Sequence, residues 1–351
     1  MFGIDARAAR AAWTVFLLGL GLYLTYLIRR TLLILVAAVL FAYLLSPLVD
    51  RVDRMFPRER SRNISLAVVY LVLLVLLILG GGLIGSAVAE QATNLAKKAP
   101  DLVAHFNQPS TWPLPPWLES RRAELAAAIQ SQVAAHGQEL MALGRQAGLE
   151  ILQVVADLPF LVLVPILSFF LLKDGSRMRR RALEEWTTGR SREILADILR
   201  DVHLLLLQYM RAIVILCLLT FFAYTIVFLV LGVPYPLLLA AVGGALEFIP
   251  FLGPLSAAVI IIVVALFAGF SKVLWLVLFF LAWRMFQDYV SSPYLMSAGI
   301  ELHPLLVILG ILAGEQIAGV PGMFLSIPVL AVLRVVVLRL SRTPPPVPVP
   351  Q

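Results

Sequence analysis

Charged residues are scarce in this chain, and their scarcity excludes an ordinary soluble domain. Asp, Glu, Lys and Arg make up 14% of the 351 residues, whereas hydrophobic residues make up 61%. A soluble globular domain is usually about 25% charged and about 45–50% apolar. We therefore expect an integral membrane protein whose surface largely faces lipid.

Cysteine and histidine are also rare, which argues against metal and redox chemistry. There is one cysteine, Cys217, and there are four histidines, no two of which have the spacing of metal ligands. We find no phosphate-binding loop of the Walker kind, which argues against ATP-driven pumping, and no local signature of a Ser/His/Asp set. The expectation is no metal, no cofactor and no enzymatic activity.

What charge there is lies mostly between apolar runs and is mostly basic. The net charge is +7, and arginines gather in residues 50–62, 173–192 and 334–342, while the turn at 232–236 has none. Short basic loops of membrane proteins stay on the cytoplasmic side. No stretch combines a basic face with stacking aromatics, so no nucleic-acid partner is expected. We predict cytoplasmic termini, with residues 90–150 facing outward.

Long apolar segments predict an all-α membrane protein of about eight transmembrane helices, since each needs about 20 mostly apolar residues. The segments cover roughly 11–28, 31–49, 64–89, 151–172, 209–231, 237–269, 273–290 and 304–340. Residues 1–89 hold three of them, 151–340 hold five, and 341–351 form a proline-rich tail. Residues 90–150 are more polar and partly amphipathic, which predicts a small extramembrane helical region.

Three segment boundaries depend on breaks in the apolar pattern. The segment 151–172 is expected to end at Lys173-Asp174-Gly175, and the amphipathic stretch 194–205 predicts a separate interfacial helix. Residues 237–269 form either one broken span or a hairpin. A hairpin would put the C-terminus outside, and the C-terminal arginines argue against that.

Two apolar segments are interrupted, at 247–254 and at 314–322. Irregular backbone survives in lipid only where it is buried in protein or lines a watery cavity, and broken helices are typical of transporter binding sites. Each interruption has an acid beside it, Glu247 in one and Glu315 in the other. Acids inside membranes usually face a partner or water. We therefore predict a transport core with two broken helices.

Glu247 has two interpretations. It binds a cation, a proton or a solute hydroxyl, or it caps free amides at the break or pairs with Arg284. Asp288 lies four residues after Arg284, a spacing that predicts an ion pair on one helix face. The candidate substrate- or ion-binding residues are Glu247, Pro250, Gly253, Pro254, Arg284, Asp288, Glu315, Gly319 and Gly322. Pro250, Gly253, Pro254 and Gly319 are candidate hinges.

Several motifs resemble the autoinducer-2 exporter (AI-2E) family of permeases. They are Phe170-Leu-Leu-Lys-Asp-Gly175, Gly232-Val-Pro-Tyr-Pro236, Phe248-Ile-Pro-Phe-Leu-Gly-Pro254, Ser292-Pro293, Leu302-His-Pro304, Gly314, Gly319-Val-Pro-Gly-Met323 and Ile327-Pro328. The chain departs from the family at Ala212-Ile213, where Gly-Gln is usual, and at Glu315, where a small residue is commoner.

The resemblance implies a secondary transporter of a bacterial inner membrane that exports a small polar molecule and forms homo-oligomers. Some relatives are proposed to exchange sodium or lithium for protons, so a cation/proton antiporter is an alternative. A membrane scaffold or regulator that does not transport is an alternative from another class, and it would make residues 90–150 the functional part.

Overall fold

The computed structural model describes residues 6–55, 62–106, 158–185, 189–249, 252–291 and 302–341, with residues 120, 123, 124, 127 and 187 between them. Nearly all of these residues are helical, and none of them lies in a strand. The all-α prediction is confirmed for this part of the chain. Most of the predicted extramembrane region, the motif at 292–293 and the tail lie outside the described residues.

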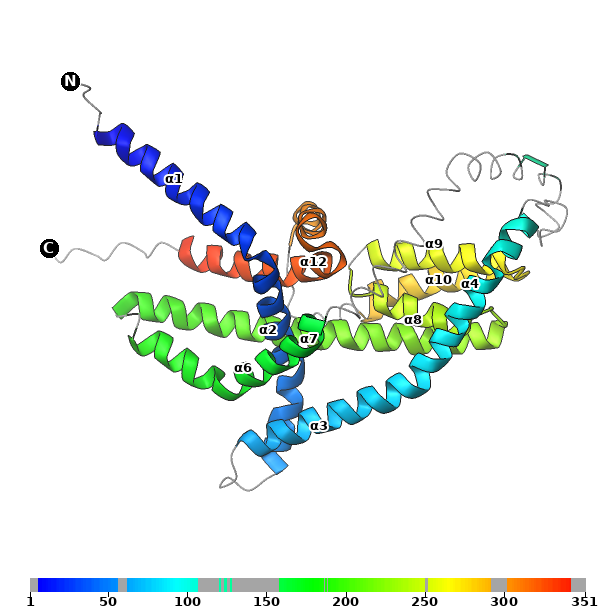
Figure 1. The fold of residues 1–351 in the computed structure, drawn as a ribbon, viewed down its shortest axis with the longest axis horizontal. Coiled ribbons are helices and arrows are strands. Elements are labelled where there is room, and N and C mark those ends of the chain that lie inside the picture. Colours follow the sequence, from blue (N-terminus) through cyan, green and yellow to red (C-terminus); the bar gives the residue numbers. More distant parts are fainter. Residues whose placement is uncertain are drawn as a thin grey trace.

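Twelve helical elements follow one another along the described chain (Figure 1). They are α1 (Ala6–Leu27), α2 (Arg29–Met55), α3 (Arg62–Gly80), the π-helical η1 (Gly81–Gly85), α4 (Ser86–Phe106), α6 (Leu158–Glu185), α7 (Gly189–Leu231), α8 (Pro236–Leu246), α9 (Leu252–Phe267), α10 (Val273–Phe286), the π-helical η4 (Gln287–Ser291) and α12 (Pro304–Ser341).

Among the described residues, 5 helices are long and apolar enough to cross a membrane. They are Arg29–Met55, Arg62–Leu95, Gly189–Leu231, Val273–Ser291 and Pro304–Ser341. Shorter apolar runs occupy α1, α8 and α9. Leu and Val side chains on α3 are extensively exposed, as lipid-facing residues are. The chain is a multi-pass membrane protein, and the count of eight spans stays a prediction.

Two predicted helix ends are wrong. Helix α6 continues through Gly175 to Glu185, and the predicted interfacial helix is the first part of α7, which is 43 residues long. A helix of that length spans about 65 Å, more than a bilayer core. Polar residues do not end a helix when pairs at i,i+4 or contacts with other helices support it. Arg181 and Glu185 form such a pair at 3.9 Å.

Helices α8 and α9 fold back on each other as a hairpin, side by side in Figure 1. A Cβ atom on Gly243 of α8 would lie 3.7 Å from Cδ1 of Ile261 on α9. These residues would be far apart in a single broken span. Leu239 and Ala265 share one core with Phe228 of α7. The hairpin interpretation of residues 237–269 is therefore the one the structure supports.

Helix α12 also folds back, at Ala318 and Gly319. Both have non-helical backbone angles, and Gly319 has a φ of 59° that favours glycine. A Cβ on Gly314 would collide with the carbonyl of Gly322, and one on Gly310 would lie 3.8 Å from Cβ of Ser326. The segments before and after the bend are therefore antiparallel for at least two turns.

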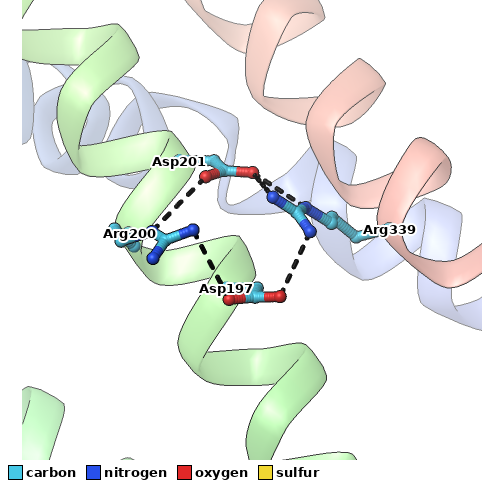
Figure 2. Close-up of polar contacts among 4 residues, drawn as sticks. All are labelled: Asp197, Arg200, Asp201 and Arg339. Atoms are coloured by element: carbon cyan, nitrogen blue, oxygen red, sulfur yellow. Dashed lines mark hydrogen bonds and ion pairs between the residues drawn. The ribbon is translucent and has the colours of Figure 1, made fainter.

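The C-terminal part of α12 is tied to the first part of α7 by an ion-pair cluster (Figure 2). Nε of Arg339 donates to Asp201 at 2.8 Å, and Nη1 donates to Asp197 at 3.1 Å. Arg200 approaches the same two aspartates at 3.8 Å. Arg339 and Asp201 are 24% and 29% exposed, so water screens this contact only in part.

We predict that Arg339→Gln lowers the unfolding temperature more than Arg200→Gln does, because charge-assisted bonds to two carboxylates are lost. Arg200→Gln removes only long contacts from a mostly exposed side chain, so we expect less than about 0.5 kcal/mol. Thermal unfolding of both variants in detergent measures the difference. Equal effects would show that Arg339 does not anchor α12.

Candidate functional site

The bends of the two hairpins meet beside α7. Phe248, at the bend between α8 and α9, packs edge-on against Phe324, just after the bend of α12, with ring centroids 5.0 Å apart. Ile249 and Ile327 belong to the same buried core as Ile213 of α7. The first interrupted segment, 247–254, is therefore in contact with α12 just beyond the second, 314–322, and α7 packs against both α8 and α12.

Glu247 lies at the first bend and is buried, with only 7% of its surface exposed. Thr220 of α7 donates a hydrogen bond to its Oε1 at 3.0 Å, and Nε2 of Gln287 in η4 donates to the same oxygen at 2.7 Å. The Gln287 amide also lies 3.2 Å from the Thr220 hydroxyl. We call Glu247, Thr220 and Gln287 the polar triad.

Glu247 is the C-cap residue of α8, but among the described residues its carboxylate accepts no backbone amide and forms no close ion pair, although the Arg284 guanidinium is near enough to interact with it electrostatically. The backbone amides of Phe248 and Ile249, which follow the end of α8, donate to the backbone carbonyls of Ala245 and Leu246 and not to the Glu247 carboxylate. Arg284 instead pairs with Asp288 at 2.9 Å on the half-exposed side of α10, as the i,i+4 spacing predicts. Buried charges in proteins are usually paired or bind metals, so a carboxylate held by two neutral donors is suited to exchanging a proton or a cation.

The other predicted site residues are spread over the two hairpins. Gly253 packs against the carbonyl of Leu246, and Pro254 lies in the first turn of α9. Gly319 forms the bend of α12, and Gly322 contacts Gly314 just beyond it. Glu315 is exposed on the first segment of α12. Pro250 lies outside the described residues.

Thr220 and Gln287 are the site residues that the sequence analysis missed. They lie 27 and 40 residues from Glu247 in sequence, in separate helices, so no motif joins them. The available signal was their polarity inside apolar runs, since hydrogen-bonding side chains within membrane helices often contact other helices.

Tyr209 of α7 has a buried hydroxyl without a hydrogen-bond partner among the described residues. Tyr70, in contrast, shares a hydrogen bond of 2.5 Å with Ser168. Removing an unpaired buried hydroxyl costs no hydrogen bond, whereas removing a paired one leaves its partner unsatisfied.

We therefore predict that Tyr209→Phe leaves the unfolding temperature unchanged or slightly raised. Tyr70→Phe should lower stability by about 1 kcal/mol. Thermal unfolding of the two variants side by side in the same detergent provides the comparison. A clear loss of stability for Tyr209→Phe would mean that its hydroxyl is bonded in the protein.

Comparisons with known proteins identify relatives of this chain. The chain is 27% identical to "Putative transport protein YrrI" of Bacillus subtilis (strain 168) over 90% of this chain and 89% of that protein. It is 24% identical to "Putative transport protein YueF" of the same organism, over 88% and 83% of the two chains. "Putative permease PerM" of Escherichia coli (strain K12) is 28% identical over 51% of this chain and 50% of that protein.

The family model described as AI-2E family transporter matches residues 13–342. That match includes all the helices of the two hairpins and all three residues of the polar triad. It confirms the resemblance drawn from the motifs at 232–236, 248–254 and 319–323. The chain belongs to the AI-2E family of transporters.

Proposed function

We propose that the protein is a secondary transporter that moves a small polar solute across a bacterial inner membrane, and that Glu247 carries its coupling ion. The observation that carries this proposal is a buried carboxylate at the meeting point of two helical hairpins. Membrane acids of this kind mark ion and substrate pathways. Autoinducer-2 is one solute that the family name suggests, and export is the direction it suggests.

The proposed topology has six crossings and two re-entrant hairpins. Helices α1, α2, α3, α6, α7 and α10 cross the membrane, while α8–α9 enters from outside and α12 enters from the cytoplasm. This keeps eight membrane-embedded units and places both termini in the cytoplasm. A single re-entrant hairpin would put the C-terminus on the outer side of the membrane, but a second one returns it to the cytoplasmic side. The contact between Arg339 and the first part of α7 supports this, since residues 173–192 precede it.

In the proposed mechanism, the hairpin bends part alternately toward each side of the membrane. Their backbone amides and carbonyls are then available to a polar solute, as in other transporters with interrupted helices. Protonation or cation binding at Glu247 changes the hydrogen bonds with Thr220 and Gln287, which come from two other helices. Ion exchange at the triad would thereby be coupled to movement of the first hairpin against α7 and η4.

The test is flux in proteoliposomes that contain the purified full chain. An imposed pH gradient should drive sodium movement, or an imposed sodium gradient should drive proton movement. Protein-free vesicles provide the baseline. Absence of both fluxes, with and without an added small polar organic solute, would contradict ion coupling at Glu247.

A cation/proton antiporter is the second candidate, because the triad alone provides an ion site without requiring an organic solute. It predicts full exchange in vesicles containing only salts. The secondary transporter of a small polar solute instead predicts that ion exchange is slow until an organic solute is added. Homo-oligomer formation is a further expectation, which size-exclusion chromatography with light scattering measures.

A further inference from the structure

An open groove runs between the C-terminal turns of α2 and the middle of α3, and none of its lining residues belongs to the hairpins or the triad. It has a volume of about 290 Å³ and is lined by Leu48, Val52, Val69, Val72 and Leu76, with Arg51 among them. Val72 and Leu76 are 51% and 62% exposed. The surface that lines the groove is apolar, so Arg51 contributes its aliphatic stem to the wall, and its guanidinium lies exposed outside that lining.

Arg51 is distinguished from its neighbours by having no partner among the described residues. Arg62 lies 4.0 Å from the carboxylate of Asp50, and Nε of Arg54 donates to the backbone carbonyl of Asp50. Asp53, the other acid of this turn, accepts a hydrogen bond from Ser65 at 2.9 Å. Both acids are engaged, so neither described carboxylate of this turn competes with an external anion for the Arg51 guanidinium.

An apolar groove beside an available arginine matches the two parts of an anionic phospholipid. An acyl chain would replace water or bulk lipid along Val69, Val72 and Leu76, and the phosphate would accept hydrogen bonds from Arg51. Guanidinium groups bind phosphate with charge-assisted and bidentate geometry. Basic residues at the cytoplasmic ends of membrane helices attract anionic headgroups. The basic loop at 50–62 places this end of α2 on that side in the proposed topology.

We propose that the groove between α2 and α3 is a binding site for one anionic phospholipid, with the phosphate on Arg51 and an acyl chain along Val72 and Leu76. A second copy of the chain is less well matched, because it would have to place an acidic side chain opposite Arg51 within a wholly apolar contact. The site is separate from the triad, so the proposal does not depend on which solute is transported.

Native mass spectrometry of the purified full chain tests the proposal, with phosphatidylglycerol and phosphatidylcholine of identical acyl chains as probes. The wild type should retain phosphatidylglycerol in preference to phosphatidylcholine. Arg51→Gln should weaken phosphatidylglycerol binding about fivefold and abolish the preference, since one charge-assisted contact is lost. Val72→Trp fills the groove without changing charge and should weaken both lipids.

The matched control is Arg181→Gln, which removes an exposed arginine at the far end of α6 and should bind both lipids as the wild type does. Equal retention of the two lipids by the wild type, or an unchanged preference in Arg51→Gln, would overturn the proposal. Loss of oligomers in Val72→Trp with unaltered lipid binding would also overturn it, and would assign the groove to a second copy of the chain.

Discussion

Glu247→Gln is expected to abolish ion-coupled flux while the protein still folds. Glutamine has the shape of glutamate, and its amide oxygen can accept the bonds that Thr220 and Gln287 donate to Oε1. The glutamine side chain does not titrate, so it cannot take up or release a proton during transport, and it presents no charge to a cation. We therefore expect at least about a hundredfold loss of flux with an unchanged unfolding temperature, since the lost step is the coupling step itself.

The measurement is sodium-driven proton movement in proteoliposomes with matched protein content. Glu185→Gln is the control, because Glu185 is exposed at the end of α6 and its ion partner within the described part of the chain is Arg181. It should transport at the wild-type rate. If Glu247→Gln transports as fast as the wild type, the coupling site lies elsewhere.

The partners of Glu247 should show smaller effects. Thr220→Val and Gln287→Leu each remove one donor but leave the carboxylate in place. Because one hydrogen bond to a charged group contributes about 1.5–3 kcal/mol, either variant should alter the ion dependence of flux by roughly tenfold or more without abolishing it. A complete loss in Thr220→Val would indicate that the hydroxyl itself is a ligand of the ion.

The sequence predicts the parts of this fold that depend on local patterns. Apolar runs indicate the helices, the proline and glycine clusters indicate both interruptions, and the spacing of Arg284 and Asp288 indicates their ion pair. Each of these depends on residues within a few positions of one another. The physical signal is therefore present in a short window of sequence.

What the sequence could not predict depends on contacts between distant segments. A Pro-Gly cluster shows that a helix is interrupted, but not whether the chain continues or folds back; in α8–α9 the packing of Gly243 against Tyr224 and Ile261 decides this. Similarly, Thr220 and Gln287 become site residues only because three helices meet. The predicted end of the helix at Gly175 is wrong for a different reason: a polar stretch remains helical when other contacts support it, and α6 continues to Glu185.

Alanine substitutions at the glycines of the second hairpin, formed by the two segments of α12, should lower stability to different extents. A Cβ on Gly314 would collide with the backbone of Gly322, and a Cβ on Gly322 would collide with the backbone of Gly314. Backbone atoms cannot rotate away as a side-chain tip can, so the two segments of α12 would have to separate. Overpacking of this kind typically costs about 1–3 kcal/mol, and we expect Gly314→Ala and Gly322→Ala to lie at the upper end.

Two other glycines provide internal comparisons. A Cβ on Gly310 would meet chiefly the side-chain tip of Leu330, which can move, so Gly310→Ala should cost less than Gly314→Ala. Gly81 in η1 has nothing within 4 Å of its Cβ position. Alanine is the better helix former by about 1 kcal/mol, so Gly81→Ala should leave stability unchanged or raised.

The apparent unfolding temperature in detergent should therefore be highest for Gly81→Ala, lower for Gly310→Ala and lowest for Gly314→Ala. For Gly314→Ala we expect it to lie about 5 °C or more below that of the wild type. Because Phe324 follows the same bend and contacts Phe248, separating the segments should also displace the contact between the hairpins. Flux in Gly314→Ala should then fall even at temperatures where the protein stays folded. Equal stability of all three variants would mean that the two segments of α12 do not pack against each other through these glycines.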